Sequence, residues 1–272
     1  MRIEAVERIS LTTRDAAGLA AFYGDAFGFR DIGRHAIDAA IYGAGGSALT
    51  LRLGSQEIEL VQFDRPGALY PPVRSSHDRF FQHIALVTTD IRRALARLPA
   101  QATMISRDAP VTLPASSGGV TAAKFRDPDG HPLELLQFPA DAIPEHWRGA
   151  TDMSQPCIGI DHSALVVTDT IRSIEFYSSI GLTVMTRTVN IGIAQDRLDY
   201  VEAARVDVIG LAPRRTTPHV ELLDYRSPRP GSSAVVADAD IAATRLILRH
   251  PGGQAPVRMM DPDGHRLVLL PG

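Results

Sequence analysis

The sequence lacks the features of a secreted or membrane protein. Cys157 is the only cysteine among 272 residues, which excludes an internal disulfide and fits a reducing compartment. No apolar run approaches the roughly 18 residues that a membrane span needs. The first ten residues, MRIEAVERIS, contain no apolar segment of the kind found in signal peptides. We therefore expect a cytoplasmic protein.

The sequence also lacks a large excess of positive or negative charge. The chain has 28 Lys and Arg against 31 Asp and Glu, a net charge of −3, and no basic run. Nucleic acid and anionic membranes attract proteins with basic patches, so neither is an expected partner. A content of 44% hydrophobic residues excludes disorder, and the length allows two domains with buried cores. A small molecule is the expected partner.

An internal repeat is present. Residues 127–137 read DPDGHPLELLQ and residues 261–270 read DPDGHRLVLL, and the two segments start 134 residues apart. A second pair begins at Ile9 (ISLTTRDAAGLAAFYGDAFGF) and at Ser163 (SALVVTDTIRSIEFYSSIGL). In both, an alternating apolar strand ends at an Asp that suits a helix N-cap, and a helix containing Phe-Tyr follows and stops at Gly. The second half therefore duplicates the first.

Each half divides once more, because the strand–Asp–helix pattern returns at His83 with Asp90 and, more weakly, at Ala234 with Asp240. Each module is predicted as β-α-β-β-β, and the modules span residues 4–65, 80–139, 158–228 and 232–271. Residues 1–139 and 158–272 are then the predicted domains, joined by a linker over 140–157. Trp147 in this linker is interpreted as a docking anchor.

Two columns of polar residues emerge when the modules are aligned. Seven residues before the four N-cap Asp residues stand Arg8, His83, His162 and Ser233. The matching positions of the last strands are Glu59, Glu134, Glu221 and Val268. Arg8 to Glu59 and His83 to Glu134 both span 51 residues, which supports the alignment. Modules 2 and 3 each carry a His and a Glu that can share an ion on one face of a small sheet.

This pattern resembles the vicinal oxygen chelate superfamily, which includes glyoxalase I, bleomycin-resistance proteins and type I extradiol dioxygenases. The resemblance rests on the Phe-Tyr helices, the first strands HIALV and HSALVV, and DPDGHPLEL before the last strand. It implies an α+β fold of four βαβββ modules, forming two cupped mixed β-sheets with helices on the outside. It also implies one divalent metal ion held by first-strand and last-strand residues. The matching positions are His83, Glu134, His162 and Glu221.

The pairing of modules decides which site is complete. If modules 2 and 3 share a cup, the site has two His and two Glu, and the other cup has no such set. If modules pair within each half, the first cup holds Glu59, His83 and Glu134, and the second keeps only His162 and Glu221. We favour the first arrangement, because it brings both His–Glu modules together. An extradiol dioxygenase of the usual layout needs ligands in modules 3 and 4, and module 4 offers none.

A nitrogen and oxygen ligand set suits Zn, Ni, Mn or Fe(II). The favoured function is a metal-dependent lyase or isomerase that acts on a small substrate with adjacent oxygens through a metal-stabilised enediolate, with Glu134 or Glu221 moving the proton. One alternative is an Fe(II)-dependent ring-cleaving dioxygenase, because two His and one Glu can form a facial triad. Another is a non-catalytic binding protein of the bleomycin-resistance type. The resemblance also allows a homodimer.

Other polar residues receive simpler interpretations. Arg8 and Glu59 are expected to form an ion pair, and His131 and His265 to belong to the DPDG turns. His219 lies two residues before Glu221 and so shares its face, which makes it a weak candidate for a ligand or a substrate contact. The residues expected to lie in the middle strands of module 3 and to line its cup are Asn190, Gln195 and Tyr200.

Overall fold

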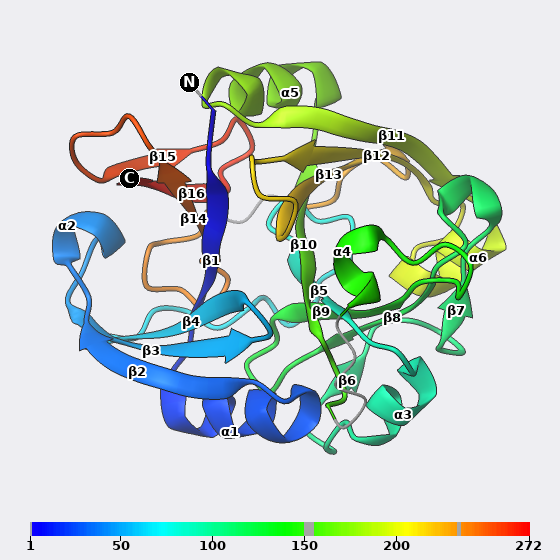
Figure 1. Cartoon of the computed structure of the whole chain (residues 1–272), viewed down its shortest axis with the longest axis horizontal. Helices are drawn as coiled ribbons and strands as arrows, with labels where there is room; N and C mark the ends of the chain where they lie inside the picture. The colour runs from blue at the N-terminus through cyan, green and yellow to red at the C-terminus, as the bar shows by residue number, and fades with distance from the viewer. Residues whose placement is uncertain (1, 150–154, 233–234) are drawn as a thin grey trace.

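A computed structural model describes residues 2–149, 155–232 and 235–272. Its strands form two mixed sheets, and Figure 1 shows these as separate curved layers with α1, α3 and α5 at the periphery. The fold class is therefore confirmed. No helix in the described ranges is both long and apolar enough to cross a bilayer.

The smaller sheet has seven strands and joins the first module to the last. Its order is β15 (Val257–Met260), β16 (Arg266–Pro271), β14 (Arg245–His250), β1 (Ala5–Thr12), β4 (Gln56–Phe63), β3 (Gly46–Leu53) and β2 (Arg30–Ala36). The central strands β1 and β14 run antiparallel, and each pairs in parallel with the last strand of its own module.

The larger sheet has nine strands and joins modules 2 and 3. Its order is β11 (Thr183–Ile191), β12 (Arg205–Ala212), β13 (His219–Ser227), β10 (Gly159–Val167), β5 (Gln82–Val87), β9 (Pro132–Gln137), β8 (Thr121–Arg126) and β6 (Thr103–Met104), with β7 (Val111–Thr112) beside β8. Modules 2 and 3 thus share one sheet, as the favoured arrangement predicts. Each sheet takes strands from both halves of the chain.

Three of the four predicted N-caps begin helices. Asp15, Asp90 and Asp169 accept backbone N–H hydrogen bonds at the first turns of three helices, and Gly28 ends the first of them at φ 87°. These helices are α1 (Ala16–Phe27), α3 (Ile91–Ala96) and α5 (Thr170–Ser179). The shorter helices are α2 (Ala39–Tyr42), η1 (Ala115–Ser117), α4 (Glu145–Arg148) and α6 (Ile193–Asp199).

The prediction for the last module is wrong. Residues 235–272 contain no helix, and Asp240 instead accepts hydrogen bonds from the N–H groups of Ala68 and Ala237. The first strand of this module is β14, because the segment fills the place between β1 and β16 and buries Leu246 and Leu248 in the core. Three modules therefore carry a helix after their first strand, and the fourth consists of β14, β15 and β16 alone.

Because β14 is the first strand of the last module, the alignment of the histidine and glutamate positions changes in that module. Ser233 lies outside the described residues, and the register identifies Arg245 as the residue in its column. Ile247 pairs with Val268, as Ala85 pairs with Glu134, so the histidine position of module 4 is two residues before Ile247.

The repeated sequence motifs join the two sheets. Tyr23 of α1 donates a hydrogen bond to Asp127 of the first DPDGH turn over 3.1 Å. His131 of that turn contacts Asp127 through Nδ1 and the Thr12 carbonyl oxygen through Nε2, at 2.8 and 2.9 Å. In the second half, Tyr177 donates a hydrogen bond to Asp261, and His265 Nε2 contacts the Val166 carbonyl oxygen. The histidines thus belong to the turns, as predicted, and both turns connect one sheet to the other.

Candidate metal centre

The four predicted ligands lie on the four central strands of the larger sheet. Ala85 of β5 pairs with Glu134 of β9, and Ala164 of β10 pairs with Glu221 of β13. His83 and His162 lie two residues before these alanines, so each His shares a face with a Glu. Because β5 and β10 are antiparallel neighbours, both His–Glu pairs face one cavity of about 360 Å³. We call this cavity the metal cup.

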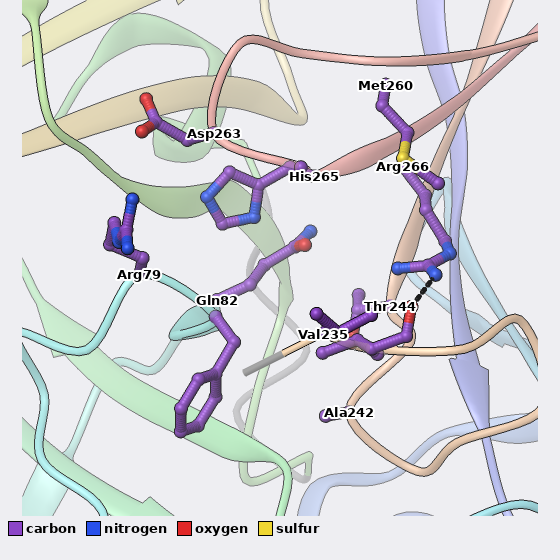
Figure 2. Close-up of a pocket in the computed structure, with 12 residues that line it drawn as sticks. Arg79, Gln82, Val235, Ala242, Thr244, Met260, Asp263, His265 and Arg266 are labelled. Atoms are coloured by element: carbon purple, nitrogen blue, oxygen red, sulfur yellow. Dashed lines mark hydrogen bonds between the residues drawn. The ribbon is translucent and has the colours of Figure 1, made fainter. Parts of the chain in front are cut away.

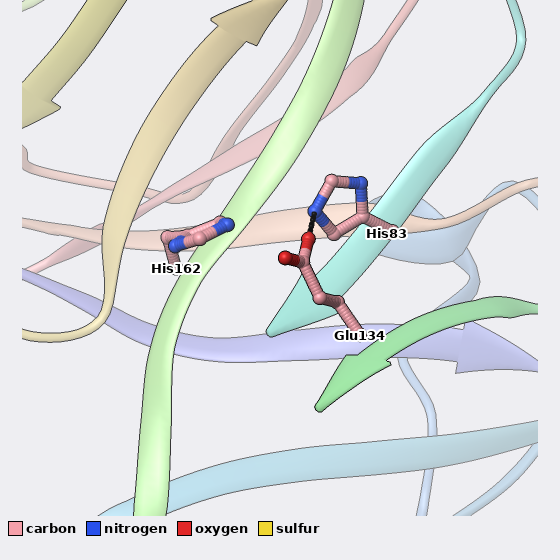
Figure 3. Close-up of side chains that lie close together, drawn as sticks. All are labelled: His83, Glu134 and His162. Carbon is pink, nitrogen blue, oxygen red and sulfur yellow. Dashed lines mark ion pairs between the residues drawn. The ribbon is translucent and has the colours of Figure 1, made fainter. Parts of the chain in front are cut away.

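Distances within the metal cup suit a shared ion. His83 Nε2 is 2.8 Å from Glu134 Oε2, and His162 Nε2 is 3.5 Å from Glu221 Oε2. Ligand atoms of His83, Glu134 and His162 all lie within 4.8 Å of one another, and Figure 3 shows these three side chains converging from different strands. Glu221 lies at the edge of this group, with 22% of its side chain exposed.

The surroundings of His83 indicate whether the metal cup suits a metal ion. The residue is 1% exposed, its Nε2 contacts only the Glu134 carboxylate, and its Nδ1 has no hydrogen-bond partner among the described residues. Buried polar groups usually have partners, so such an imidazole indicates a ligand. Burial and the Lys124 charge lower the pKa of His83, which favours the neutral form that binds metals. The donor set of imidazole and carboxylate therefore fits a divalent ion.

Behind His162 is a carboxylate that sequence analysis missed. Asp161 Oδ2 lies 3.0 Å from His162 Nδ1, and Trp147 Nε1 donates a hydrogen bond to Asp161 Oδ1 over 3.0 Å. Such an outer carboxylate orients an imidazole so that its other nitrogen can bind a metal. Trp147 is buried, which confirms its predicted role as an anchor. The adjacent Asp-His pair within β10 was the available signal.

His219 lies in the metal cup, as its alternation with Glu221 predicts. Its Nε2 is 3.4 Å from Glu221 Oε1, and its ring centroid is 5.2 Å from that of His162. Asp161, His162 and His219 form a second group that could hold an ion, adjacent to the first. His219 is therefore a neighbour of the candidate base Glu221.

A buried lysine is the second residue that sequence analysis missed. Lys124 of β8 pairs with Glu134 and lies 2.6 Å from Asp199 Oδ1 and 3.9 Å from Glu134 Oε2. Although burial opposes ionisation, Lys124 and His83 lower the pKa of Glu134 to about 2. Asp199 also accepts hydrogen bonds from Gln195 and Tyr225. A single lysine in the apolar strand TAAKFR was the only signal.

The predictions for the cup-lining residues of module 3 and for Arg8 and Glu59 are confirmed only in part. Asn190 of β11 and Gln195 line the metal cup, but Gln195 lies in helix α6 and not in a middle strand. Tyr200, which follows α6, is 55% exposed and stacks on Arg107 away from the metal cup. Arg8 and Glu59 form the expected ion pair at 2.7 Å in the smaller sheet.

Comparisons with known proteins agree with this architecture. Residues 5–135 match the family model of the Glyoxalase/Bleomycin resistance protein/Dioxygenase superfamily. Glyoxalase I from Zea mays is 16% identical, with a TM-score of 0.59 over 99% of this chain and 92% of that chain. A proposed dioxygenase from Bacillus subtilis subsp. subtilis str. 168 is 11% identical, with a TM-score of 0.61 over 99% of this chain and 86% of that chain. No curated protein matches the chain. Residues 5–135 are thus similar in sequence to this superfamily, and the chain shares its fold over its whole length with the two solved structures.

Proposed function

We propose that the protein is a divalent-metal-dependent lyase or isomerase acting on a small substrate with adjacent oxygens. The observation that carries this proposal is the buried His83 imidazole, which lies 2.8 Å from Glu134, has no hydrogen-bond partner at Nδ1 among the described residues, and faces a second His–Glu pair. His83, Glu134 and His162 would hold the ion, with Glu221 at its edge. When bound, the ion supplies a Lewis acid that stabilises negative charge on substrate oxygens.

Glu221 is the glutamate suited to move a proton. Its side chain is 22% exposed toward the cavity, against 7% for Glu134, and its contacts to His162 and His219 are both longer than 3.3 Å. Glu134 instead lies 2.8 Å from His83 and close to the Lys124 charge. A base has to reach a substrate carbon and exchange its proton, which requires the freer side chain. Glu221 would transfer the proton between neighbouring carbons while Glu134 remains a ligand.

The walls of the metal cup limit the substrate to a small molecule. Apolar side chains surround the polar floor, and those lining the cavity include Leu113, Leu136, Phe138, Leu198, Val208 and Leu223. A cavity of about 360 Å³ fits a compact ligand. Its apolar walls would exclude water from the reacting carbons, so that the charge on the substrate is stabilised by the site rather than by solvent.

Metal analysis tests this proposal. Protein purified without chelator is expected to contain close to one divalent ion per chain, and His83→Ala and His162→Ala are expected to lose it. The matched control is His35→Ala, at an exposed position of β2. If the wild type binds no ion and the two variants match the control, the enzyme proposal is wrong and the binding-protein alternative stands.

A ring-cleaving dioxygenase is the second candidate. The observation that favours it is that His83, Glu134 and His162 are two His and one carboxylate, the set that binds Fe(II) in many oxygenases. Oxygen uptake with catechols after anaerobic Fe(II) loading would support it. Turnover of a hydroxy- or oxo-substrate without oxygen, using Zn, Ni or Mn, would support the lyase or isomerase.

A further inference from the structure

The smaller sheet forms a second cup in which arginines stand where the metal cup has histidines. Arg8 lies two residues before Ser10, which pairs with Glu59, as His162 lies two residues before the partner of Glu221. Arg245 takes the corresponding position of β14, and Val268 replaces the glutamate. Guanidinium groups do not bind metal ions, so this cup differs from the metal cup in chemistry.

Two more arginines lie on the same face of this sheet. Arg266 pairs with Arg245 across β16 and β14, and Arg258 pairs with Val268 across β15 and β16. Side chains that face each other across neighbouring strands point to one side of the sheet. We call Arg245, Arg258 and Arg266 the arginine cup.

Carboxylates balance this charge only in part. Glu59 is occupied by Arg8 and by the Tyr42 hydroxyl. Among the described residues, only Asp238 forms ion pairs with these three arginines: its carboxylate lies 2.5 Å from Arg258, 3.1 Å from Arg266 and 3.9 Å from Arg245. One carboxylate thus forms ion pairs with three guanidinium groups. Burial and the charge of Arg266 lower the pKa of Arg245 to about 10, although Asp238 opposes this shift.

Space for a ligand lies beside these groups. A cavity of about 300 Å³ is lined by all three arginines and Asp238, with Ile41 and Val268 as apolar wall. A neighbouring hollow of about 220 Å³ shares Arg266 and Met260 with it. Figure 2 shows that hollow, with the Arg266 guanidinium directed toward the loop near Val235 and Thr244; its Nη2 donates a hydrogen bond to the Val236 carbonyl. Arg266 is therefore held in place at the wall between the two cavities.

We propose that the arginine cup binds a small organic anion through a carboxylate or phosphate group. Planar guanidinium groups match the oxygens of these anions and form charge-assisted hydrogen bonds with them. Such a ligand would supply the negative charge that Asp238 alone does not provide, and its body would contact Ile41 and Val268. The site is separate from the metal cup and does not depend on the proposed reaction.

Calorimetric titration with inorganic phosphate and with malonate tests the proposal, at low ionic strength and in both metal-loaded and chelator-treated full-length protein. Saturable binding is expected in both preparations and in His83→Ala. Arg258→Gln is expected to weaken it roughly tenfold or more. Arg52→Gln is the matched control, because Arg52 is similarly exposed and its ion pair with Glu57 measures 2.6 Å, on another strand.

Asp238→Asn provides the second arm. Removing the competing carboxylate is expected to tighten phosphate binding and to increase the rise in melting temperature that phosphate produces. The proposal is overturned if the wild type binds neither anion, if Arg258→Gln binds as tightly as Arg52→Gln, or if Asp238→Asn binds phosphate no better than the wild type. Binding that disappears in His83→Ala would assign the anion to the metal cup instead.

Discussion

The two glutamates of the metal cup differ in their surroundings, and this difference underlies the proposal that Glu134 is a ligand and Glu221 a base. Glu134→Gln is expected to lower metal affinity at least about tenfold, because it removes an ionised ligand beside His83. Glu221→Gln is expected to retain most of the metal but to lower turnover by about 10²–10⁴. Metal content and kcat measured on both variants check this. The reverse pattern would exchange the two roles.

Lys124 and Asp199 form a buried ion pair whose loss should be costly. Both side chains are at most 4% exposed, so Lys124→Met leaves a buried carboxylate without its cation and is expected to cost about 3–5 kcal/mol. In Lys124→Met/Asp199→Asn the Asp199 charge is removed together with its cation, so the double variant should be destabilised by clearly less than the sum of the single variants. Urea denaturation of the four proteins measures the coupling. Additivity within about 0.5 kcal/mol would show that the pair is not coupled.

At the scale of elements, the DPDGH turn predicts a pH dependence of stability. Burial disfavours the His131 imidazolium, but Asp127 outweighs it and raises the pKa above the ordinary 6.5. Both ring nitrogens also face acceptors, which requires both to donate. Because the pKa of His131 is higher in the folded than in the unfolded state, protonated His131 stabilises the fold fully below pH 6.5. This contribution to the free energy of unfolding is lost as the pH rises through the higher, folded-state pKa. The difference in unfolding free energy between wild type and His131→Gln should therefore shrink from pH 6 to pH 9.

Urea denaturation with chelator present measures this difference, so that metal binding does not contribute. His35→Gln, at an exposed position, controls for the loss of a histidine as such. A difference that stays constant across this range would contradict the imidazolium assignment.

The last module shows where prediction from a local sequence pattern fails. The segment ADADIAATRL has a plausible N-cap and apolar residues at helical spacing, and on local grounds a helix was a reasonable prediction. The competing factor is the open position between β1 and β16, where a strand satisfies backbone hydrogen bonds on both sides. Pairing with residues more than 200 positions away is invisible to a local pattern.

At the scale of the whole molecule, both sheets depend on strand pairs that cross the halves. β1 pairs with β14 and β5 pairs with β10, so residues 1–139 alone would expose two central strands as edges. We expect this fragment not to persist as a folded monomer, and we expect mixing with residues 158–272 to restore the native circular dichroism spectrum. Light scattering and circular dichroism check this. A stable, folded monomer of 1–139 would show that the predicted first domain is independent.

The internal symmetry also explains why one chain can carry two different cups. Equivalent strand positions hold imidazoles in the larger sheet and guanidinium groups in the smaller one, while the core faces behind them remain alike in apolar character. The backbone positions side chains at the same register in both sheets, and the side chains decide which ion each cup attracts.

The sequence by itself determined the features that depend on local physics. Alternation, N-cap aspartates and repeated turns identified the modules, and recurrence of one His–Glu pair at matching positions identified His83, Glu134, His162 and Glu221. Only the tertiary structure decided that modules 2 and 3 share a sheet, that Lys124, Asp161 and Asp199 lie around these candidate ligands, and that Arg245 occupies the column assigned to Ser233. These facts depend on which distant strands pair, and the free energy of that pairing comes from contacts that no single segment contains.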